Sequence, residues 1–248
     1  MTRSSLYSGC LLLAILLFSC HRDSGKETIT VSGVFRNGAG RSVFFREMTP
    51  SGIRTLDSAR LGVSGHYSFS LKRGEAGFYV LSAGDHQNLV LTLEKGDKAG
   101  VSGDLDSALE GARITGSDES RRYGEFYGES MANLEIADSL EKILKENLGS
   151  DEFYRLSTSY DTVFGAILQA QRELEKNYIR EHPGSLSSLL VLNFSFGPEP
   201  VLSWDRDSAL FVLLDTSLAR KYPGNQHWLF HHQRILEYRR EARVKKNL

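Results

Sequence analysis

The feature that most constrains the fold of this chain is a change of hydrophobic period close to residue 116. Before that point, apolar and polar residues alternate, as in Tyr67, Phe69 and Leu71 with serines between them. This is the period of a strand that buries one face. After it, apolar residues recur at spacings of three, four or seven, which is typical of amphipathic helices. The sequence therefore predicts an α+β chain, with strands first and helices second.

Glycine usage supports the same division. Fourteen of the 23 glycines lie in residues 27–116, and seven lie in residues 117–248. Glycine supplies the backbone conformations of tight turns, so we expect an antiparallel β-sandwich domain over 27–116, with a barrel as the alternative. Strands are expected at 29–35, 42–46, 53–61, 67–71, 78–81, 89–93 and 99–103, with a last short strand from 114.

Residues 117–248 are expected to form an α-helical module of about five helices. Ser117 precedes two acids, a pattern that favours a helix start, and Gly149 is expected to end this first helix. Ser150 is expected to cap a second helix that reaches Pro183. Three further helices are expected at 185–196, 203–222 and 225–244. Because 185–196 is almost wholly apolar, we expect it, including Leu190, to be the buried centre of the module.

The first 26 residues read as an export signal and a tether. Arg3 is the only charge before residue 21, and residues 11–18 are continuously apolar. That run is shorter than the roughly 20 residues of a membrane-spanning helix and suits a signal peptide over 1–19. Leu17-Phe18-Ser19-Cys20 resembles a bacterial lipobox, although Phe18 replaces the usual small residue. We therefore expect lipid attachment at Cys20 and a lipidated tether over 20–26, a plain secretory signal being the alternative.

Cysteine usage and net charge exclude several classes of function. No cysteine follows Cys20, so the exported chain is expected to form no internal disulfide and to perform no dithiol redox chemistry by itself. The formal net charge of −1 shows no basic excess, so nucleic acid is not expected as a partner. No GxSxG, P-loop or GxGxxG motif occurs, and we expect the chain not to be an enzyme and to need no cofactor.

The order of short motifs along the chain resembles a family of exported Bacteroidetes lipoproteins. In that family an uncharacterised β-rich N-terminal domain and a helical linker precede a thioredoxin domain of the TlpA-like, AhpC/TSA type. The residues that carry the resemblance are Thr30-Val31-Ser32-Gly33, Gly65-His66-Tyr67-Ser68-Phe69, Gly77-Phe78-Tyr79-Val80-Leu81, Leu91-Thr92-Leu93-Glu94-Lys95-Gly96-Asp97, Ile114-Thr115-Gly116-Ser117, Tyr178 to Ser185 and Tyr222-Pro223. His182 stands where the family often has Asn.

The resemblance implies a location and a role, with one departure. Redox members of the family continue into a domain with a Cys-x-x-Cys pair, which this sequence lacks. We therefore expect a lipoprotein of the cell envelope, at the outer membrane and facing the periplasm or the surface, with a non-catalytic binding or scaffold role. The alternative is an accessory subunit of envelope thiol–disulfide exchange that works with a separate thioredoxin-like partner.

Several residues are weighed as metal or catalytic groups. His227, His231 and His232 would share one helix, but no HExxH-type Glu accompanies them, so a packed helix is favoured over a metal site. Asp104 with Asp106, and Asp205 with Asp207, lack the Gly and distal Glu of a calcium loop. Turn-making and capping are favoured for both pairs, and we expect no metal site. Glu94, Asp97 and Asp104 could be considered as glycosidase carboxylates, but any chain with 31 acidic residues offers such pairs, so we expect no catalytic pair.

Two surface features complete the candidates. The last fifteen residues hold six Lys or Arg and two Glu, which favours a helix end carrying cations over contact with an acidic partner or anionic lipid. Three Asp-Ser-Ala triplets, at 57–59, 106–108 and 207–209, resemble an O-glycosylation acceptor of exported proteins in this phylum. The first two triplets are expected in exposed loops.

Overall fold

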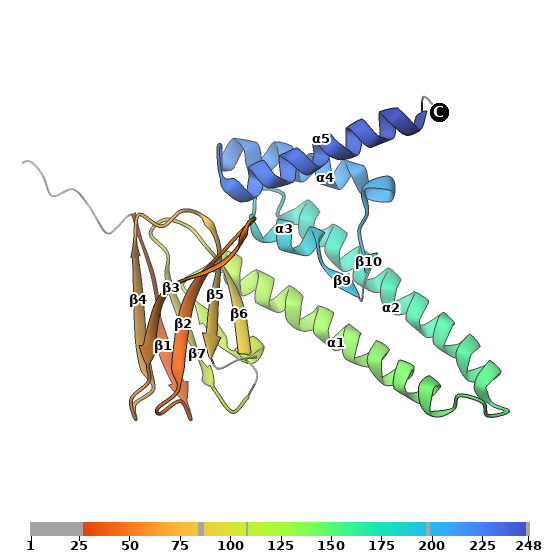
Figure 1. Ribbon diagram of the computed structural model, residues 1–248, viewed down its shortest axis with the longest axis horizontal. Coiled ribbons are helices and arrows are strands. Elements are labelled where there is room, and N and C mark those ends of the chain that lie inside the picture. Colours follow the sequence, from red (N-terminus) through yellow and green to blue (C-terminus); the bar gives the residue numbers. More distant parts are fainter. Residues whose placement is uncertain (1–26, 84–86, 108, 197–198, 247–248) are drawn as a thin grey trace, which may run out of the picture.

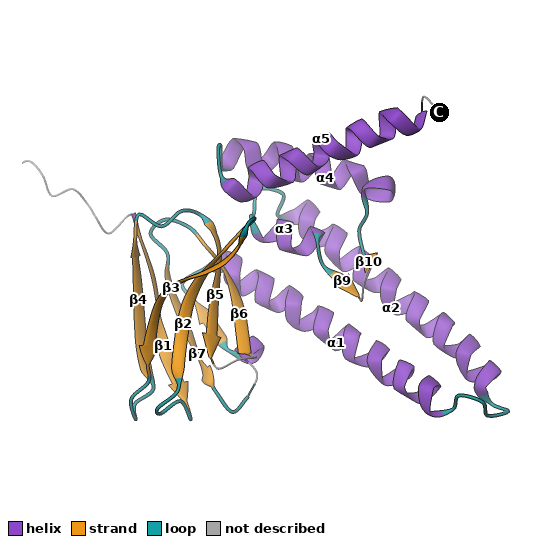
Figure 2. Cartoon of the chain, in the orientation of Figure 1, coloured by secondary structure: helices purple, strands orange, loops and turns teal. Residues whose placement is uncertain are grey.

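A computed structural model describes residues 27–83, 87–107, 109–196 and 199–246 of the chain. A β-sandwich of two four-stranded sheets is followed by five α-helices (Figures 1 and 2), so the predicted α+β class is confirmed. The strands of the sandwich are β1 (Thr28–Arg36), β2 (Ser42–Thr49), β3 (Gly52–Arg60), β4 (His66–Lys72), β5 (Gly77–Ala83), β6 (Gln87–Leu93), β7 (Lys98–Asp104) and β8 (Arg113–Thr115). A 3-10 turn, η2 (Leu109–Gly111), precedes β8.

The two sheets have the strand orders β4-β1-β7-β8 and β3-β2-β5-β6. Every pair is antiparallel except β1 with β7, which runs parallel with Val31 opposite Ala99. The expectation of a purely antiparallel sandwich was therefore wrong at this pair. The physical reason is that the chain builds β4 and all four strands of the other sheet between β1 and β7, so no hairpin turn sets their relative direction.

The inner faces of the two sheets enclose a core of their own. Phe45 of one sheet stacks on Phe69 of the other, with ring centroids 5.6 Å apart. Phe35 and Tyr67 stack at 4.9 Å, and the Tyr67 hydroxyl donates a hydrogen bond to the Val101 carbonyl at 2.7 Å. These side chains are nearly or fully buried. The strand alternation seen in the sequence thus produces a closed apolar layer between the sheets.

The helical part comprises α1 (Asp118–Glu146), α2 (Phe153–Glu181), α3 (Ser187–Leu192), α4 (Trp204–Lys221) and α5 (Gln226–Lys246), with a short hairpin of β9 (Ser195–Phe196) and β10 (Glu199–Pro200). Figure 1 shows α1 and α2 as a long antiparallel hairpin that extends away from the sandwich. The far end of α5 points away from the sandwich as well. None of the helices in the described ranges is both long and apolar enough to cross a bilayer.

Helix starts follow local capping chemistry only in part. Ser117 caps α1 as expected, because its side chain accepts the Ser120 N–H. Gly116 makes this start possible: its φ is +71°, and a Cβ there would lie 2.1 Å from the Lys98 carbonyl oxygen. Ser150 does not cap α2, which begins at Phe153 after Glu152, without a side-chain cap. The backbone carbonyl of Ser150, and not its hydroxyl, accepts the Phe153 N–H.

The expected helix at 185–196 is shorter than its apolar run. It ends at Leu192, where the Asn193 side chain donates to the Leu189 carbonyl, and the chain turns into β9. The run is buried as expected, with Leu186 and Val191 fully inaccessible. Leu190 is an exception, because it is only partly buried. The reason is that α3 faces a groove on that side.

The β-sandwich and the helical part pack directly against each other. Strand β5 is buried along its whole length, since one face looks into the sandwich core and Phe78 on the other face joins the helical core. Met48 and Val90 of neighbouring strands pack against that same helical core. The helical part therefore covers the outer face of this sheet at β5, at Val90 of β6 and at the end of β2, while β3 stays largely exposed.

Candidate functional site

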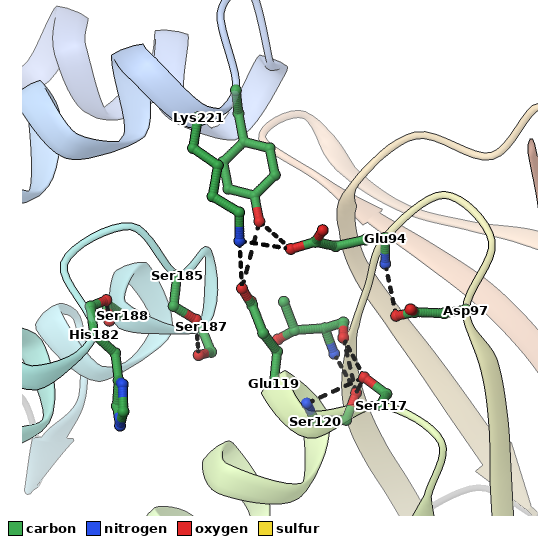
Figure 3. A network of polar contacts seen from close by, with 12 residues as sticks. Glu94, Asp97, Ser117, Glu119, Ser120, His182, Ser185, Ser187, Ser188 and Lys221 are labelled. Carbon is green, nitrogen blue, oxygen red and sulfur yellow. Dashed lines mark hydrogen bonds and ion pairs between the residues drawn. The ribbon is translucent and has the colours of Figure 1, made fainter. Parts of the chain in front are cut away.

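A network of polar side chains ties the sandwich to the helices (Figure 3). Lys221, the last residue of α4, donates to Glu94 after β6 at 2.8 Å and to Glu119 in the first turn of α1 at 3.3 Å. The Tyr222 hydroxyl donates to the same Glu94 oxygen. Three segments far apart in the sequence thus converge on one ion-pair cluster.

The two carboxyl groups in this cluster are shifted in opposite directions. Burial raises the pKa of Glu119, against the hydrogen bond from Ser185 and the charge of Lys221. Burial acts in the same sense on Glu94, but the hydrogen bonds from Lys221 and Tyr222 outweigh it and hold the pKa of Glu94 below its ordinary value. Glu94 is therefore the charged partner of Lys221, and Glu119 is the group that binds a proton more readily.

Below this cluster, two serines join α1 to the sheet through its backbone. The hydroxyl groups of Ser117 and Ser120 both donate to the Thr92 carbonyl, at 3.0 and 2.9 Å. Ser120 Oγ also accepts the Thr92 N–H at 3.0 Å. Since a lost partner for a buried backbone group costs about 1–3 kcal/mol, these bonds hold α1 in one orientation against β6. They fix the position of α1 relative to the sheet, and α1 forms one wall of the groove described next.

A groove of about 460 Å³ runs along this boundary. Its volume lies within the ordinary range for small-molecule sites. It is lined by the end of β2 and its turn, β5, α1, α3, β9 and the first half of α5, through Met48, Thr49, Pro50, Phe78, Tyr123, Leu189, Leu190, Asn193, Phe194, Ser195, His227, Phe230, His231 and Arg234. Most of these side chains are apolar or aromatic, and Phe230 is 46% exposed.

The start of α5 is fixed relative to the groove by Asn225. The Asn225 side chain accepts the His227 N–H at 3.0 Å, as a helix cap. Its amide nitrogen donates to the Ala76 carbonyl, just before β5, at 2.6 Å. One side chain therefore both caps the start of α5 and attaches this helix to the sandwich. These bonds fix where Phe230 and Arg234 of α5 lie relative to the groove.

The ionisable nitrogen groups of the groove are the cation of Arg234 and the rings of His227 and His231. Burial lowers the pKa of His227 and of His231. His231 Nε2 lies 3.1 Å from the Phe211 carbonyl oxygen, so this nitrogen carries the proton and donates. Arg234 donates to the Asn193 side-chain oxygen at 3.2 Å, and its guanidinium lies over the Tyr238 ring. Within the described ranges, no carboxylate forms an ion pair with Arg234. An apolar groove with an uncompensated guanidinium suits a molecule with an apolar body and one anionic group.

The three histidines that were weighed as metal ligands do not converge. His227 packs on Phe78 with ring centroids 4.4 Å apart, and His231 bonds to backbone as above. His232 faces the Asp215 carboxylate, 3.0 Å away. In the described part of the chain no three His, Cys, Asp or Glu side chains are grouped so that they could hold a metal ion.

The acids proposed from the sequence are also separate. Asp97 accepts the Glu94 N–H in the turn after β6, whereas Asp104 lies at the other end of β7 and accepts from Asn37 and the Asp106 N–H. Asp207 is buried, pairs with Arg172 at 2.5 Å and accepts the Ser203 N–H. The contacts of Asp97 and Asp104 are those of turns, and the Ser203 N–H bond of Asp207 belongs to a helix start, whereas its pairing with Arg172 is a buried ion pair between α2 and α4.

The remaining candidates fall in different surroundings. The triplet from Asp57 lies in strand β3, and not in the loop that was expected, although Asp57 and Ser58 are exposed. Asp106 and Ser107 lie in an exposed turn, and Asp207-Ser208 lies in α4. Cys20, the signal segment and the tether lie outside the described residues.

A second buried polar cluster lies between α1 and α2. Gln171 donates to Ser130 at 2.9 Å and to Glu175 at 3.1 Å. The other carboxyl oxygen of Glu175 has no hydrogen-bond partner in the described residues, and the side chain is fully inaccessible. Burial raises the pKa of Glu175 to about 8, so this carboxyl group is protonated at neutral pH.

This shift predicts a pH-dependent stability. The folded chain holds the Glu175 proton more tightly than the unfolded chain, so its contribution is complete below the ordinary pKa of 4.5 and is lost as the pH rises through about 8. In that window the free energy of unfolding falls by up to roughly 1.4 kcal/mol per pH unit. We expect Glu175→Gln to flatten this fall in urea unfolding curves measured from pH 5 to pH 8. Glu173→Gln on the same helix is the control, and an unchanged slope in Glu175→Gln would contradict the assignment.

Sequence reasoning missed the groove. In the sequence, Arg234 was considered only as one of the cations of the basic C-terminal end. Asn193 was assigned to a helix and Phe78 to a strand. The signal available in the sequence was Phe230 next to the histidines in 227–232, but nothing local indicated which strand it faces. Comparisons with protein-family models, with curated proteins and with solved structures gave no match. What the groove can bind follows from its own chemistry.

Proposed function

We propose that this chain is a lipid-anchored binding protein of the cell envelope that holds an amphipathic anion in the groove between its sandwich and its helices. The anchor is the lipid on Cys20, and the role is binding without catalysis. The observation that carries the proposal is the pairing of an aromatic groove with Arg234, whose charge meets no carboxylate in the described residues. The ligand class is an aromatic or aliphatic body with one carboxylate, sulfonate or similar group.

The shape of the groove supports this class of ligand. Phe78 and Tyr123 lie at its buried side, and Phe230 is exposed at its edge. An apolar body would be covered by these rings, while its anionic group would lie against Arg234. Hydrogen bonds to a charged group contribute about 1.5–3 kcal/mol each, so the guanidinium adds selectivity for an anion over a neutral molecule of the same shape.

A pair of fluorescent probes tests the proposal. 8-Anilinonaphthalene-1-sulfonate has an aromatic body with a sulfonate, and N-phenyl-1-naphthylamine has the same body without a charge. We expect the chain to bind both, and Arg234→Gln to weaken the sulfonate probe about tenfold or more, which corresponds to about 1.4 kcal/mol. The affinity for the neutral probe is expected to stay within about twofold.

Two further variants serve as controls. Phe230→Ala removes an exposed wall of the groove and is expected to weaken both probes. Arg240→Gln removes an exposed cation of the same helix outside the groove and is expected to weaken neither. Equal losses for both probes in Arg234→Gln, or equal effects of Arg234→Gln and Arg240→Gln on the sulfonate probe, would show that the anion does not bind at Arg234.

A further inference from the structure

The hairpin of α1 and α2 exposes apolar side chains far from the sandwich. Here we call its outer part, residues 133–170, the arm. Leu148 is 75% and Tyr154 is 83% exposed, and both lie near its tip. Ile136, Ile143, Val163 and Leu168 are exposed along its length. Exposed apolar residues grouped on one element mark surfaces for macromolecular contact.

The arm is also acidic. It contains seven acidic and three basic residues. Its basic residues are neutralised within the arm, since Lys142 pairs with Glu146, Lys145 with Glu141 and Arg155 with Glu152. The four remaining carboxylates, on Glu135, Asp138, Asp151 and Asp161, are exposed and form no ion pair within the described ranges. On α2, Tyr154, Asp161 and Leu168 recur at a spacing of seven and therefore share one face of the helix.

The far end of α5 has the complementary character. Arg239, Arg240, Arg243 and Lys245 are exposed, and none of them forms an ion pair in the part of the chain that the structure describes. Leu236 is 50% and Val244 is 55% exposed. Because residues at spacings of four and seven share a face, Leu236, Arg240, Arg243 and Val244 form one stripe of mixed apolar and basic character.

We propose that the chain forms a two-fold symmetric dimer in which the far end of α5 of each copy docks on the arm of the other. The apolar residues of the two stripes would pack together, and the arginines would meet the four unpaired carboxylates. A two-fold arrangement forms this contact twice. An anionic membrane is disfavoured as the occupant of the arm, because the arm is itself acidic. The dimer contact is separate from the groove and does not depend on the proposed ligand.

Charge reversal on each side tests the dimer. The mass of the full chain in detergent is measured by light scattering after size exclusion, and we expect a dimer at about 0.05 M salt that dissociates at about 0.5 M, where screening shortens the Debye length. The α5 variant, with Arg239, Arg240 and Arg243 each changed to Glu, is expected to halve the protein mass at low salt. The arm variant, with Glu135, Asp138, Asp151 and Asp161 each changed to Lys, is expected to do the same. An equal mixture of the two variants restores opposite charges at both contacts, so we expect the dimer mass to return.

A matched variant controls for net charge. Arg60, Lys72 and Arg113 are exposed on the sandwich and form no ion pair within the described residues, and changing all three to Glu is expected to leave the dimer intact. Circular dichroism checks that each variant is folded; if the arm variant does not fold, the α5 variant and the salt series still decide the result. A monomeric native chain at low salt, or a dimer that survives the α5 reversal, would overturn the proposal. So would a native chain that stays monomeric while binding vesicles of anionic lipid through α5.

Discussion

Replacing Leu214 with aspartate is expected to unfold the helical part of the molecule while the β-sandwich stays folded. Leu214 lies on α4, is fully inaccessible and belongs to the core that the helices share. An aspartate there would place an unpaired charge among apolar side chains, at a cost on the order of several kcal/mol. That is comparable to the whole stability of many domains.

The sandwich is expected to survive because it closes a separate core between its sheets. Loss of the helices would expose only its outer face, with Phe78, Met48 and Val90. Both tryptophans, Trp204 and Trp228, lie in the helical part, so their fluorescence reports on the helices alone.

Backbone hydrogen exchange of β1 and β5, measured by mass spectrometry, reports on the sandwich. Leu213→Asp is the control, because Leu213 is the adjacent residue of the same helix and is 36% exposed. We expect it to change stability by less than about 1 kcal/mol. If Leu214→Asp instead removes protection from the strands together with the helices, the two parts fold as one cooperative unit and the boundary near residue 116 separates no domains.

The second large effect concerns Cys20. If the lipobox assignment is right, Cys20→Ser abolishes incorporation of radiolabelled palmitate into the chain and shifts the processed protein out of the membrane fraction. Two or more acyl chains give stable attachment, whereas a single chain is marginal. The effect is therefore expected to be nearly complete.

Cys10→Ser is the matched control. Cys10 is the other cysteine of the chain and follows a small residue, Gly9, as Cys20 follows Ser19. It lacks a preceding apolar run of sufficient length, so its replacement is expected to leave labelling unchanged. Continued labelling of Cys20→Ser would mean that the lipid is attached elsewhere, and an unlabelled native chain would favour a plain secretory signal.

The candidate site could be predicted from sequence only in fragments. The basic end of α5 and the aromatic run at 227–232 were visible, but they were interpreted as a helix end carrying cations and as a packed helix. Arg234 is a candidate binding residue because it lines the same groove as Asn193 and Phe78, which lie 41 and 156 positions away in the chain. No local pattern encodes that meeting, because it arises from how α3, α5 and β5 pack.

The sequence by itself determined the local structure: strands before residue 116, helices after it, a cap at Ser117 and a buried α3. Hydrophobic period and capping act over a few residues, so they can be read from neighbouring positions. Tertiary structure alone decided that β7 runs parallel to β1, that α3 stops at Leu192, and that Leu190 faces a groove. It also decided that the far ends of α1, α2 and α5 remain uncovered. These outcomes depend on which apolar faces meet, and that choice is made by packing between segments far apart in the chain.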